Sequence, residues 1–207
     1  MKIYNLTVGP LAVNCTVLSD DKGNCFIFDA GDDAEHIEKF LKEKNLNLKK
    51  LINTHGHFDH IGAVEYLREK FNVPFYINRE DEFLVEQASN ISEMYGLPPV
   101  KVPKIDEHLS EGDIFTLGDV EIEVIATPGH SPGGMCFYID KMKLLIAGDT
   151  LFKDSIGRTD FPYSDHNTLL KSIREKLFVL DDDVQVITGH GENTEIGYEK
   201  KYNPFVR

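Results

Sequence analysis

The amino-acid sequence predicts a layered α/β (α+β) protein, and three observations lead to this prediction. Short apolar runs rich in Val, Ile and Phe recur along the chain and are bounded by turn-forming residues, as strands are. Longer segments between them have apolar residues at helical spacing. The order of strands followed by helices appears twice, on either side of a proline-rich segment at 96–103. Because the sheets need cover on their apolar faces, the elements are expected to stack in layers.

The first half of the chain is expected to start with strands and then alternate helices with strands. Ile37, Phe40 and Leu41 fall on one side of a helix, which makes their segment amphipathic. The expected strands are within Lys2–Ser19 and at Cys25–Asp29, Leu51–Thr54 and Val73–Ile77, and the expected helices are Asp33–Lys44, Ile61–Phe71 and Arg79–Ala88.

The segment Gly96–Pro103 contains three prolines and is expected to be a loop that joins two halves of the protein. The second half repeats the strand-then-helix order. Its expected strands are Ile114–Leu117, Val120–Ala126, Met135–Ile139, Lys143–Ile146 and Val184–Ile187, and its expected helix is Asp165–Leu177.

The composition fits one folded domain, residues 1–207, since 41% of the residues are hydrophobic and 28% are charged. A net charge of −13 argues against a nucleic-acid partner, whose phosphates would be repelled. No apolar run is long enough to span a membrane, and the first residues have no secretory signal pattern. Cys15, Cys25 and Cys136 match no C-x-x-C spacing, so we expect buried thiols in a reducing cytoplasm.

The segment Thr54–His60 reads T-H-G-H-F-D-H and has three imidazoles and a carboxylate within six residues, 55 to 60. In an extended chain, His55 and His57 point to the same side, roughly 6.6 Å apart. On a helix they would lie on opposite sides, so this is not the helical H-E-x-x-H zinc pattern. The pattern indicates a strand end and a loop, with Asp59 and His60 entering the first turn of a helix. We interpret it as a metal site rather than a His-rich surface loop.

Four apolar strands each run into a potential metal ligand. These ligands are His55 after Leu51–Thr54, His130 after Ile122–Thr127, Asp149 after Leu144–Ala147 and His190 after Val184–Thr188. Groups at the ends of several strands can converge on one site. With His57, Asp59 and His60 they make seven ligands, which suits two ions if one carboxylate bridges them. A set of nitrogen and oxygen donors without thiolate fits two divalent metal ions. We expect zinc, and iron or manganese are the alternatives.

The remaining three histidines, His36, His108 and His166, do not follow apolar strands. We expect them to be surface or helix-capping residues.

Five motifs resemble, in their order along the chain, those of the metallo-β-lactamase fold superfamily, and the resemblance covers nearly the whole chain. They are F-D-A-G at 28–31, T-H-G-H-F-D-H at 54–60, T-P-G-H at 127–130, A-G-D-T at 147–150 and T-G-H at 188–190. The resemblance implies a four-layer αβ/βα sandwich of two mixed β-sheets with outer helices and metals at one edge. It also implies ligand roles: His55, His57 and His130 for the first metal, Asp59, His60 and His190 for the second, Asp149 as the bridge, and Asp29 as the acid that orients a ligand or its loop.

Within the superfamily, the stretch 148–158 resembles glyoxalase II, in which a basic residue at the position of Arg158 meets the glutathione carboxylate. Arg can make that contact bidentately; the alternative is a surface pair between Arg158 and Asp160. The stretch 155–161 also resembles small glyoxalase II-like hydrolases and persulfide dioxygenases. On this basis Gly157, Arg158 and Phe161 are expected to contact the substrate.

Two departures from glyoxalase II concern the carrier of the acyl group. The chain ends at residue 207 and is expected to lack the C-terminal helical domain that helps hold glutathione. An aromatic residue that follows the last His in glyoxalase II is replaced here by the sequence G-E-N at 191–193.

The function expected from these features is hydrolysis of a small-molecule thioester, S-lactoylglutathione or a related acyl thioester. A hydroxide shared by two metals would attack the carbonyl, with Asp59 and Asp149 as the catalytic carboxylates. The main alternative is a persulfide dioxygenase with one Fe(II) held by His55, His130 and Asp149. A lactonase, a β-lactamase and a non-enzymatic metal-binding protein are further alternatives.

Overall fold

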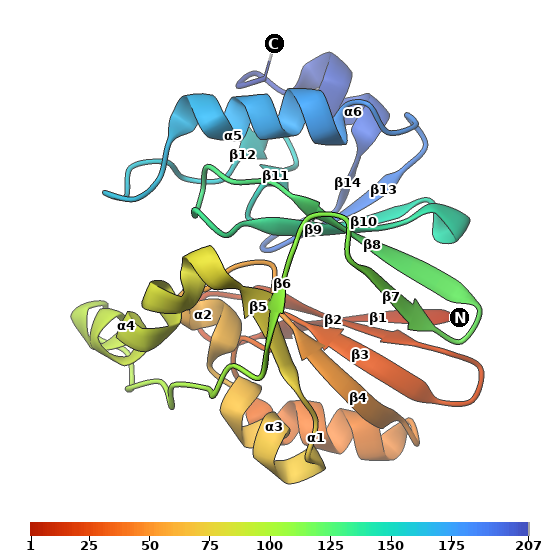
Figure 1. Ribbon diagram of the computed structural model, residues 1–207, viewed down its shortest axis with the longest axis vertical. Helices are drawn as coiled ribbons and strands as arrows, with labels where there is room; N and C mark the ends of the chain where they lie inside the picture. The colour runs from red at the N-terminus through yellow and green to blue at the C-terminus, as the bar shows by residue number, and fades with distance from the viewer. Residues whose placement is uncertain (207) are drawn as a thin grey trace.

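The computed structural model describes residues 1–206 and arranges them in four layers, two facing sheets between two layers of helices (Figure 1). Helices α1 (Ala34–Glu43) and α3 (Val64–Phe71) cover the outer face of one sheet. Helices α5 (His166–Ser172) and α6 (Ile196–Tyr202) cover the outer face of the other. The expected αβ/βα sandwich with two mixed sheets and outer helices is therefore confirmed.

The first sheet comes from the first half of the chain and has the strand order β1-β2-β3-β4-β5-β6. Its first three strands are antiparallel neighbours, and the pairs from β3 to β6 are parallel. The strands are β1 (Lys2–Val8), β2 (Val13–Ser19), β3 (Asn24–Phe28), β4 (Asn47–Ile52), β5 (Phe75–Asn78) and β6 (Glu107–Leu109).

The second sheet has the strand order β14-β13-β10-β9-β8-β7. Its neighbours are antiparallel except for the parallel pair of β10 and β13. The strands are β7 (Ile114–Leu117), β8 (Val120–Ala126), β9 (Met135–Ile139), β10 (Leu144–Gly148), β13 (Gln185–Thr188) and β14 (Thr194–Glu195); a separate hairpin pairs β11 (Leu151–Phe152) with β12 (Ser155–Ile156).

Three apolar clusters fill the spaces between the four layers. The central one joins the facing sheets and includes Phe28 and Phe137, whose ring centroids are 4.9 Å apart. The other two lie between each sheet and its helices, around residues such as Ile37 of α1 and Leu169 of α5. Burying a side chain of this size stabilises the fold by roughly 1.5–3 kcal/mol relative to leaving it exposed. The clusters therefore hold the two sheets at a fixed spacing.

The helix expected at Ile61–Phe71 is divided in two. Helix α2 (Phe58–Ile61) ends at Gly62, and α3 begins at Val64. The reason is a tertiary hydrogen bond, because the backbone N–H of Ala63 donates to the carbonyl of Ala30, 3.0 Å away. Because that N–H bonds to a distant carbonyl, it makes no hydrogen bond within a helix. The chain also packs closely at this point, since a side chain at Gly62 would collide with the carbonyl of Gly31.

Other differences from the expected elements are at boundaries or in very short strands. The helix expected at Arg79–Ala88 begins as η1 (Arg79–Asp81) and continues as α4 (Glu82–Met94). The helix expected at Asp165–Leu177 has Asp165 as its N-cap and ends in a π-helical turn, η3 (Ile173–Leu177). Sequence patterns of two or three residues are too short to show a period, which is why β6, β11, β12 and β14 were not predicted. Helix α6, with seven residues, was also not predicted.

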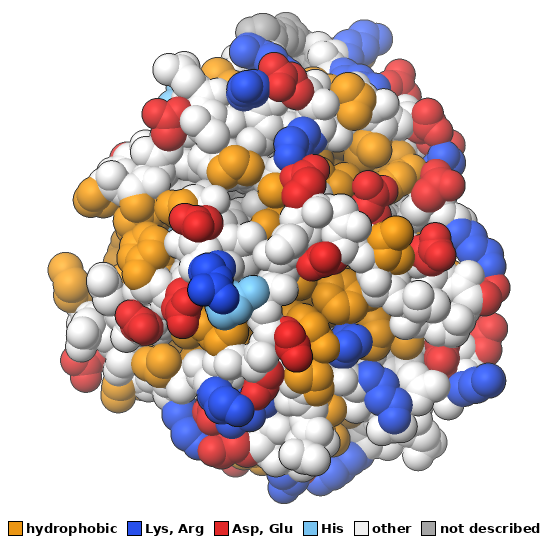
Figure 2. Space-filling view, in the orientation of Figure 1, with side chains coloured by type: hydrophobic (Ala, Val, Ile, Leu, Met, Phe, Trp, Pro, Cys, Tyr) orange, Lys and Arg blue, Asp and Glu red, His pale blue; other side chains and the backbone are white. Residues whose placement is uncertain are grey.

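The three cysteines are buried and free of disulfides. Burial raises the pKa of the Cys25 thiol to about 12 and that of the Cys136 thiol to about 11, so both stay protonated. Within residues 1–206, no helix is long and apolar enough to cross a membrane. Acidic and basic side chains are interspersed over the face shown in Figure 2, with hydrophobic side chains between them.

Candidate metal centre

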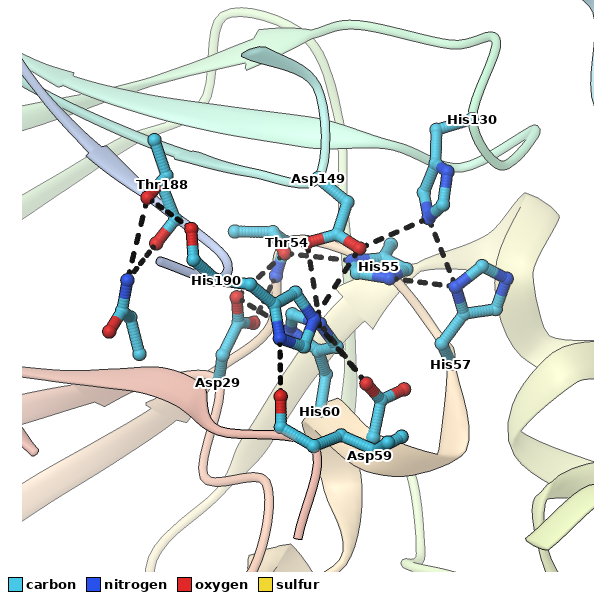
Figure 3. Close-up of polar contacts among 12 residues, drawn as sticks. Asp29, Thr54, His55, His57, Asp59, His60, His130, Asp149, Thr188 and His190 are labelled. Carbon is cyan, nitrogen blue, oxygen red and sulfur yellow. Dashed lines mark hydrogen bonds and ion pairs between the residues drawn. The ribbon is translucent and has the colours of Figure 1, made fainter. Parts of the chain in front are cut away.

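Strand direction brings the predicted ligands to one edge of the sandwich. Strands β8 and β10 each run antiparallel to β9, and β13 runs parallel to β10, so these three strands point the same way. His130, Asp149 and His190 follow their carboxyl ends. His55 follows β4 of the facing sheet, and the four side chains converge between the sheets (Figure 3).

Backbone hydrogen bonds join the two sheets at the same edge. The N–H of Met135 donates to the carbonyl of Thr54, and the N–H of Asn14 donates to the carbonyl of Gly189, each at 2.8 Å. These bonds hold the loops that carry the ligands at a definite separation, because each loop is tied to a strand of the opposite sheet.

Three imidazoles form the first ligand group. The Nδ1 atom of His57 lies 3.0 Å from Nε2 of His55 and 3.0 Å from Nε2 of His130. Nitrogens that share one ion at about 2.0–2.1 Å are expected to be about 3 Å apart. The three nitrogens thus have the spacing of a metal-binding face, and the rings point toward a common centre (Figure 3).

Asp59, His60 and His190 form the second ligand group. The Nε2 atoms of His60 and His190 are 3.2 Å apart. Oδ2 of Asp59 lies 3.4 Å from Nε2 of His190 and 3.9 Å from Nε2 of His60. Helix α2 presents Asp59 and His60 together, as the sequence suggested, and His190 comes from the other half of the chain.

Asp149 lies between the two groups. Its Oδ2 atom is 3.5 Å from Nε2 of His130 in the first group and 3.6 Å from Nε2 of His190 in the second. Its Oδ1 atom is 3.5 Å from Nε2 of His60 and is buried without a hydrogen-bond donor among the described residues. A buried carboxylate oxygen that lacks a donor but faces imidazole nitrogens fits a cation at this position.

The outer nitrogen of each histidine faces an oxygen atom. Three of these oxygens belong to side chains: His57 Nε2 lies 2.8 Å from the Tyr163 hydroxyl, His55 Nδ1 lies 3.0 Å from Thr54 Oγ1, and His60 Nδ1 lies 3.1 Å from Asp29 Oδ2. The other two are backbone carbonyl oxygens: His130 Nδ1 lies 2.8 Å from that of Arg158, and His190 Nδ1 lies 2.9 Å from that of Leu11. An N–H that donates outward leaves the other ring nitrogen with its lone pair directed at the centre. This is the arrangement that metal-binding histidines use.

Asp29 is placed behind both ligand groups by a left-handed backbone conformation, with φ of 54°. Its carboxylate accepts hydrogen bonds from the backbone N–H and the hydroxyl of Thr54, at 2.8 and 2.7 Å. It also faces His60, while Thr54 faces His55. One buried acid thus lies in position to orient a candidate ligand of each group, which is the role that the resemblance predicts for it.

The electrostatics of the site favour cation binding. Burial and the neighbouring imidazoles lower the pKa of His55 and His57, which keeps both rings neutral and able to bind a metal. For His60 burial acts downward, but Asp149, Asp59 and Asp29 raise its pKa to about 10. The carboxylates therefore stabilise positive charge at this point, which a bound ion supplies in place of a proton.

Two glycines give the bridging carboxylate its space. Gly148 has φ of +49°, and a side chain there would lie 2.3 Å from Thr54 Oγ1. A Cβ atom at Gly189 would lie 2.0 Å from Asp149 Oδ1. The glycines that precede Asp149 and His190 therefore allow the two strand ends to approach the ligand groups closely.

A cavity of about 350 Å³ opens onto the ligands and has an aromatic wall of Tyr95, Phe152, Phe161 and Tyr163. Arg158 also lines it. The Arg158 guanidinium makes a bidentate pair with Asp160, at 2.9 and 3.0 Å, and lies 4.7 Å from the centre of the Phe161 ring.

Of the three residues predicted to contact substrate, Arg158 and Phe161 line this cavity. Gly157 is instead buried against the Asp149 backbone, where a Cβ atom would lie 1.9 Å from the carbonyl oxygen. The wall residues Tyr95 and Tyr163 were not predicted, because neither lies beside a ligand in the sequence.

Comparison with known proteins identifies the family. The model of the metallo-beta-lactamase superfamily matches residues 8–190. The chain belongs to this superfamily. It is 41% identical to hydroxyacylglutathione hydrolase GloC of Haemophilus influenzae over 100% of this chain and 98% of that protein.

Solved structures agree with this assignment. The BLEG-1 B3 metallo-beta-lactamase superposes with a TM-score of 0.93 and 38% identity, covering 99% of each chain. The protein TTHA1623, in a di-iron-bound form, superposes with a TM-score of 0.90 and 33% identity, covering 98% of this chain and 99% of that one.

This metallo-beta-lactamase-fold centre also depends on Asp81, which the sequence analysis did not single out. Asp81 is fully buried at the end of η1. Its carboxylate accepts hydrogen bonds from the N–H of Gly56 at 2.9 Å, the hydroxyl of Ser131 at 2.7 Å and the N–H of Gly133 at 2.6 Å. It therefore ties the loop of His55 and His57 to the loop of His130. An Asp near a helix start has no sequence signal for such a role.

The three histidines outside the motifs lie away from both ligand groups. His36 and His166 are exposed, and His108 contacts Arg79 and Glu82. His166 lies 3.2 Å from Thr159 Oγ1. None belongs to a potential metal-binding group among the described residues.

Replacing Tyr163 with Phe is expected to weaken metal binding about 10- to 100-fold, the range for loss of a group that orients a ligand. The change removes the oxygen that faces His57 Nε2 and leaves the ring stack on Phe161 in place. Competition with a chelator would measure the affinity. Tyr95→Phe, in the same cavity wall but without contact to a ligand, is the control. Equal affinities for the two variants would contradict this role.

Proposed function

We propose that this protein is a hydrolase of thioesters that uses two divalent metal ions, most simply zinc. The observation that carries the proposal is the position of Asp149, whose carboxylate faces both ligand groups: Oδ2 lies near His130 and His190, and Oδ1 lies near His60. Six ligands around one shared carboxylate would give each ion four protein ligands, so water or substrate would enter as a fifth ligand, an expansion that zinc accepts during catalysis.

His55, His57, His130 and Asp149 would hold one ion, and Asp59, His60, His190 and Asp149 the other. Bound divalent ions lower the pKa of water toward about 7 and polarise a carbonyl oxygen. Asp59 is in a position to accept a hydrogen bond from the attacking water, because one of its oxygens faces His190 and its side chain borders the cavity. Nearby imidazoles lower the pKa of Asp59 although burial opposes this, so it accepts hydrogen bonds as a carboxylate.

Two observations support a thioester as the substrate. The relative GloC carries the name hydroxyacylglutathione hydrolase, and hydroxyacylglutathione is a thioester. The cavity also offers Arg158 beside aromatic rings, a combination that suits a polar carrier with a carboxylate. Binding it would require Arg158 to exchange its exposed pair with Asp160, which costs little because such pairs contribute about 0–1 kcal/mol.

Hydrolysis of a β-lactam is the second candidate, favoured by the 38% identity to the BLEG-1 enzyme. Elemental analysis should be combined with three assays: S-lactoylglutathione hydrolysis, hydrolysis of a chromogenic cephalosporin, and oxygen uptake with glutathione persulfide. Two ions per chain and turnover of the thioester are expected. Turnover of the cephalosporin without turnover of the thioester would show that the protein is a β-lactamase instead. One iron with oxygen uptake would favour a dioxygenase that uses His55, His130 and Asp149.

A further inference from the structure

We propose that a second cavity, beside the metal centre, binds the apolar acyl chain of the substrate. The inference rests on the proposed thioesterase function and adds that acyl groups longer than lactoyl are accepted.

This acyl cavity has a volume of about 510 Å³, larger than the 350 Å³ of the cavity that opens onto the ligands. The turn between β1 and β2 forms one wall, α2 forms another, and the proline-rich segment around Leu97 and Val100 closes the third side. Most of the lining side chains are aliphatic, aromatic or proline. A space of this size and character suits a hydrocarbon chain.

Four polar side chains line the acyl cavity, and each has a contact of its own. Asp32 Oδ1 accepts a hydrogen bond from the N–H of Asp33 at 2.6 Å, and Asp59 Oδ2 lies 3.4 Å from Nε2 of His190. The Ser92 hydroxyl donates to the Pro98 carbonyl at 2.6 Å, and the Lys101 ammonium pairs with Glu69 at 2.7 Å. Because these groups have partners of their own, they leave the apolar surface of the cavity available for a chain that carries no charge.

The acyl cavity is adjacent to the reaction centre. Leu11, Phe58 and Asp59 line both cavities, so the two spaces lie on either side of these side chains. Asp59 belongs to the second ligand group. The smaller cavity holds the ligands, so a carbonyl group placed at them has the acyl cavity on the far side of Leu11, Phe58 and Asp59, where one of the two arms of a substrate would extend.

Both cavities have a mainly apolar lining, so the position of the cationic Arg158 assigns the arms. The smaller cavity contains the imidazoles and Arg158, the cation that suits a polar or anionic thiol carrier. The larger cavity is mainly apolar and suits the acyl arm. Each methylene removed from water contributes about 0.8 kcal/mol, so affinity should increase about fourfold for each methylene that enters the cavity.

The test uses the metal-loaded protein and S-acyl-N-acetylcysteamine thioesters with acyl chains of two to eight carbons. For the wild type, kcat/KM is expected to rise with chain length. Val100→Trp, which fills the cavity, should reduce the ratio of the six-carbon to the two-carbon rate at least about tenfold. Val102→Trp is the matched control, since Val102 lies on the same segment, is 40% exposed and does not line the cavity. Thermal unfolding and metal content confirm that each variant is folded.

Binding of S-alkyl-N-acetylcysteamine thioethers, measured by calorimetry, separates this inference from the proposed function. Affinity that rises with alkyl length in the wild type and in Val102→Trp but not in Val100→Trp supports the cavity, even if no thioester is hydrolysed. Affinity that is independent of length in the wild type, or a length dependence that Val100→Trp retains, overturns it. The variants Val100→Glu and Val102→Glu repeat the comparison with a charged side chain in place of the bulky Trp.

Discussion

Asp149→Ala is expected to lose at least about a hundredfold in turnover and to retain fewer metal ions than the wild type. Groups that only orient metal ligands are worth about 10- to 100-fold, and Asp149 is itself shared by the two ligand groups. Its removal leaves His60, His130 and His190 facing one another without the carboxylate between them. Elemental analysis and kcat for the thioester would measure both effects.

Asp119→Ala is the control for this variant, because Asp119 is an exposed acid paired with Lys141 on the surface. It removes the same charge from the chain and should leave turnover and metal content unchanged. Two ions per chain together with normal kcat in Asp149→Ala would rule out the shared carboxylate as the centre of the mechanism.

Asp81→Ala is expected to lower the free energy of unfolding by about 3–5 kcal/mol. The change leaves the N–H groups of Gly56 and Gly133 and the Ser131 hydroxyl without their acceptor, and each buried unpaired group costs about 1–3 kcal/mol. Urea unfolding of the metal-free protein would measure the loss without a contribution from bound ions.

Glu80→Ala, at the exposed neighbouring position, should change the free energy of unfolding by less than about 0.5 kcal/mol. A similarly small change in Asp81→Ala would show that water replaces the lost carboxylate and that Asp81 does not hold the two loops together.

The order of strands and helices was predictable because it depends on local periodicity. Strands β7, β8 and β9 have the expected bounds. The interruption between α2 and α3 was not predictable, since it depends on the carbonyl of Ala30, more than thirty residues away in the chain. Local propensity specifies an element, but a hydrogen bond from a distant segment can end it.

The candidate metal ligands could be named from the sequence because they occur in dense or strand-terminal motifs. Their partition into two groups came from the family resemblance, and the structure places the same residues in these groups. Asp81 and Tyr163 could not be named, because they reach the ligand loops only through folding and have no motif of their own.

By itself, the sequence determined the layered α/β class, the superfamily and the set of candidate ligands, because these depend on residue types at short spacings. The tertiary structure alone decided how the loops are held and where the cavities lie. Those features depend on segments that are far apart in the chain: Asp81 accepts a hydrogen bond from Gly133, and Phe58 lines one cavity together with the proline-rich segment. Such contacts arise only when the two sheets pack face to face and bring both halves of the chain to one edge.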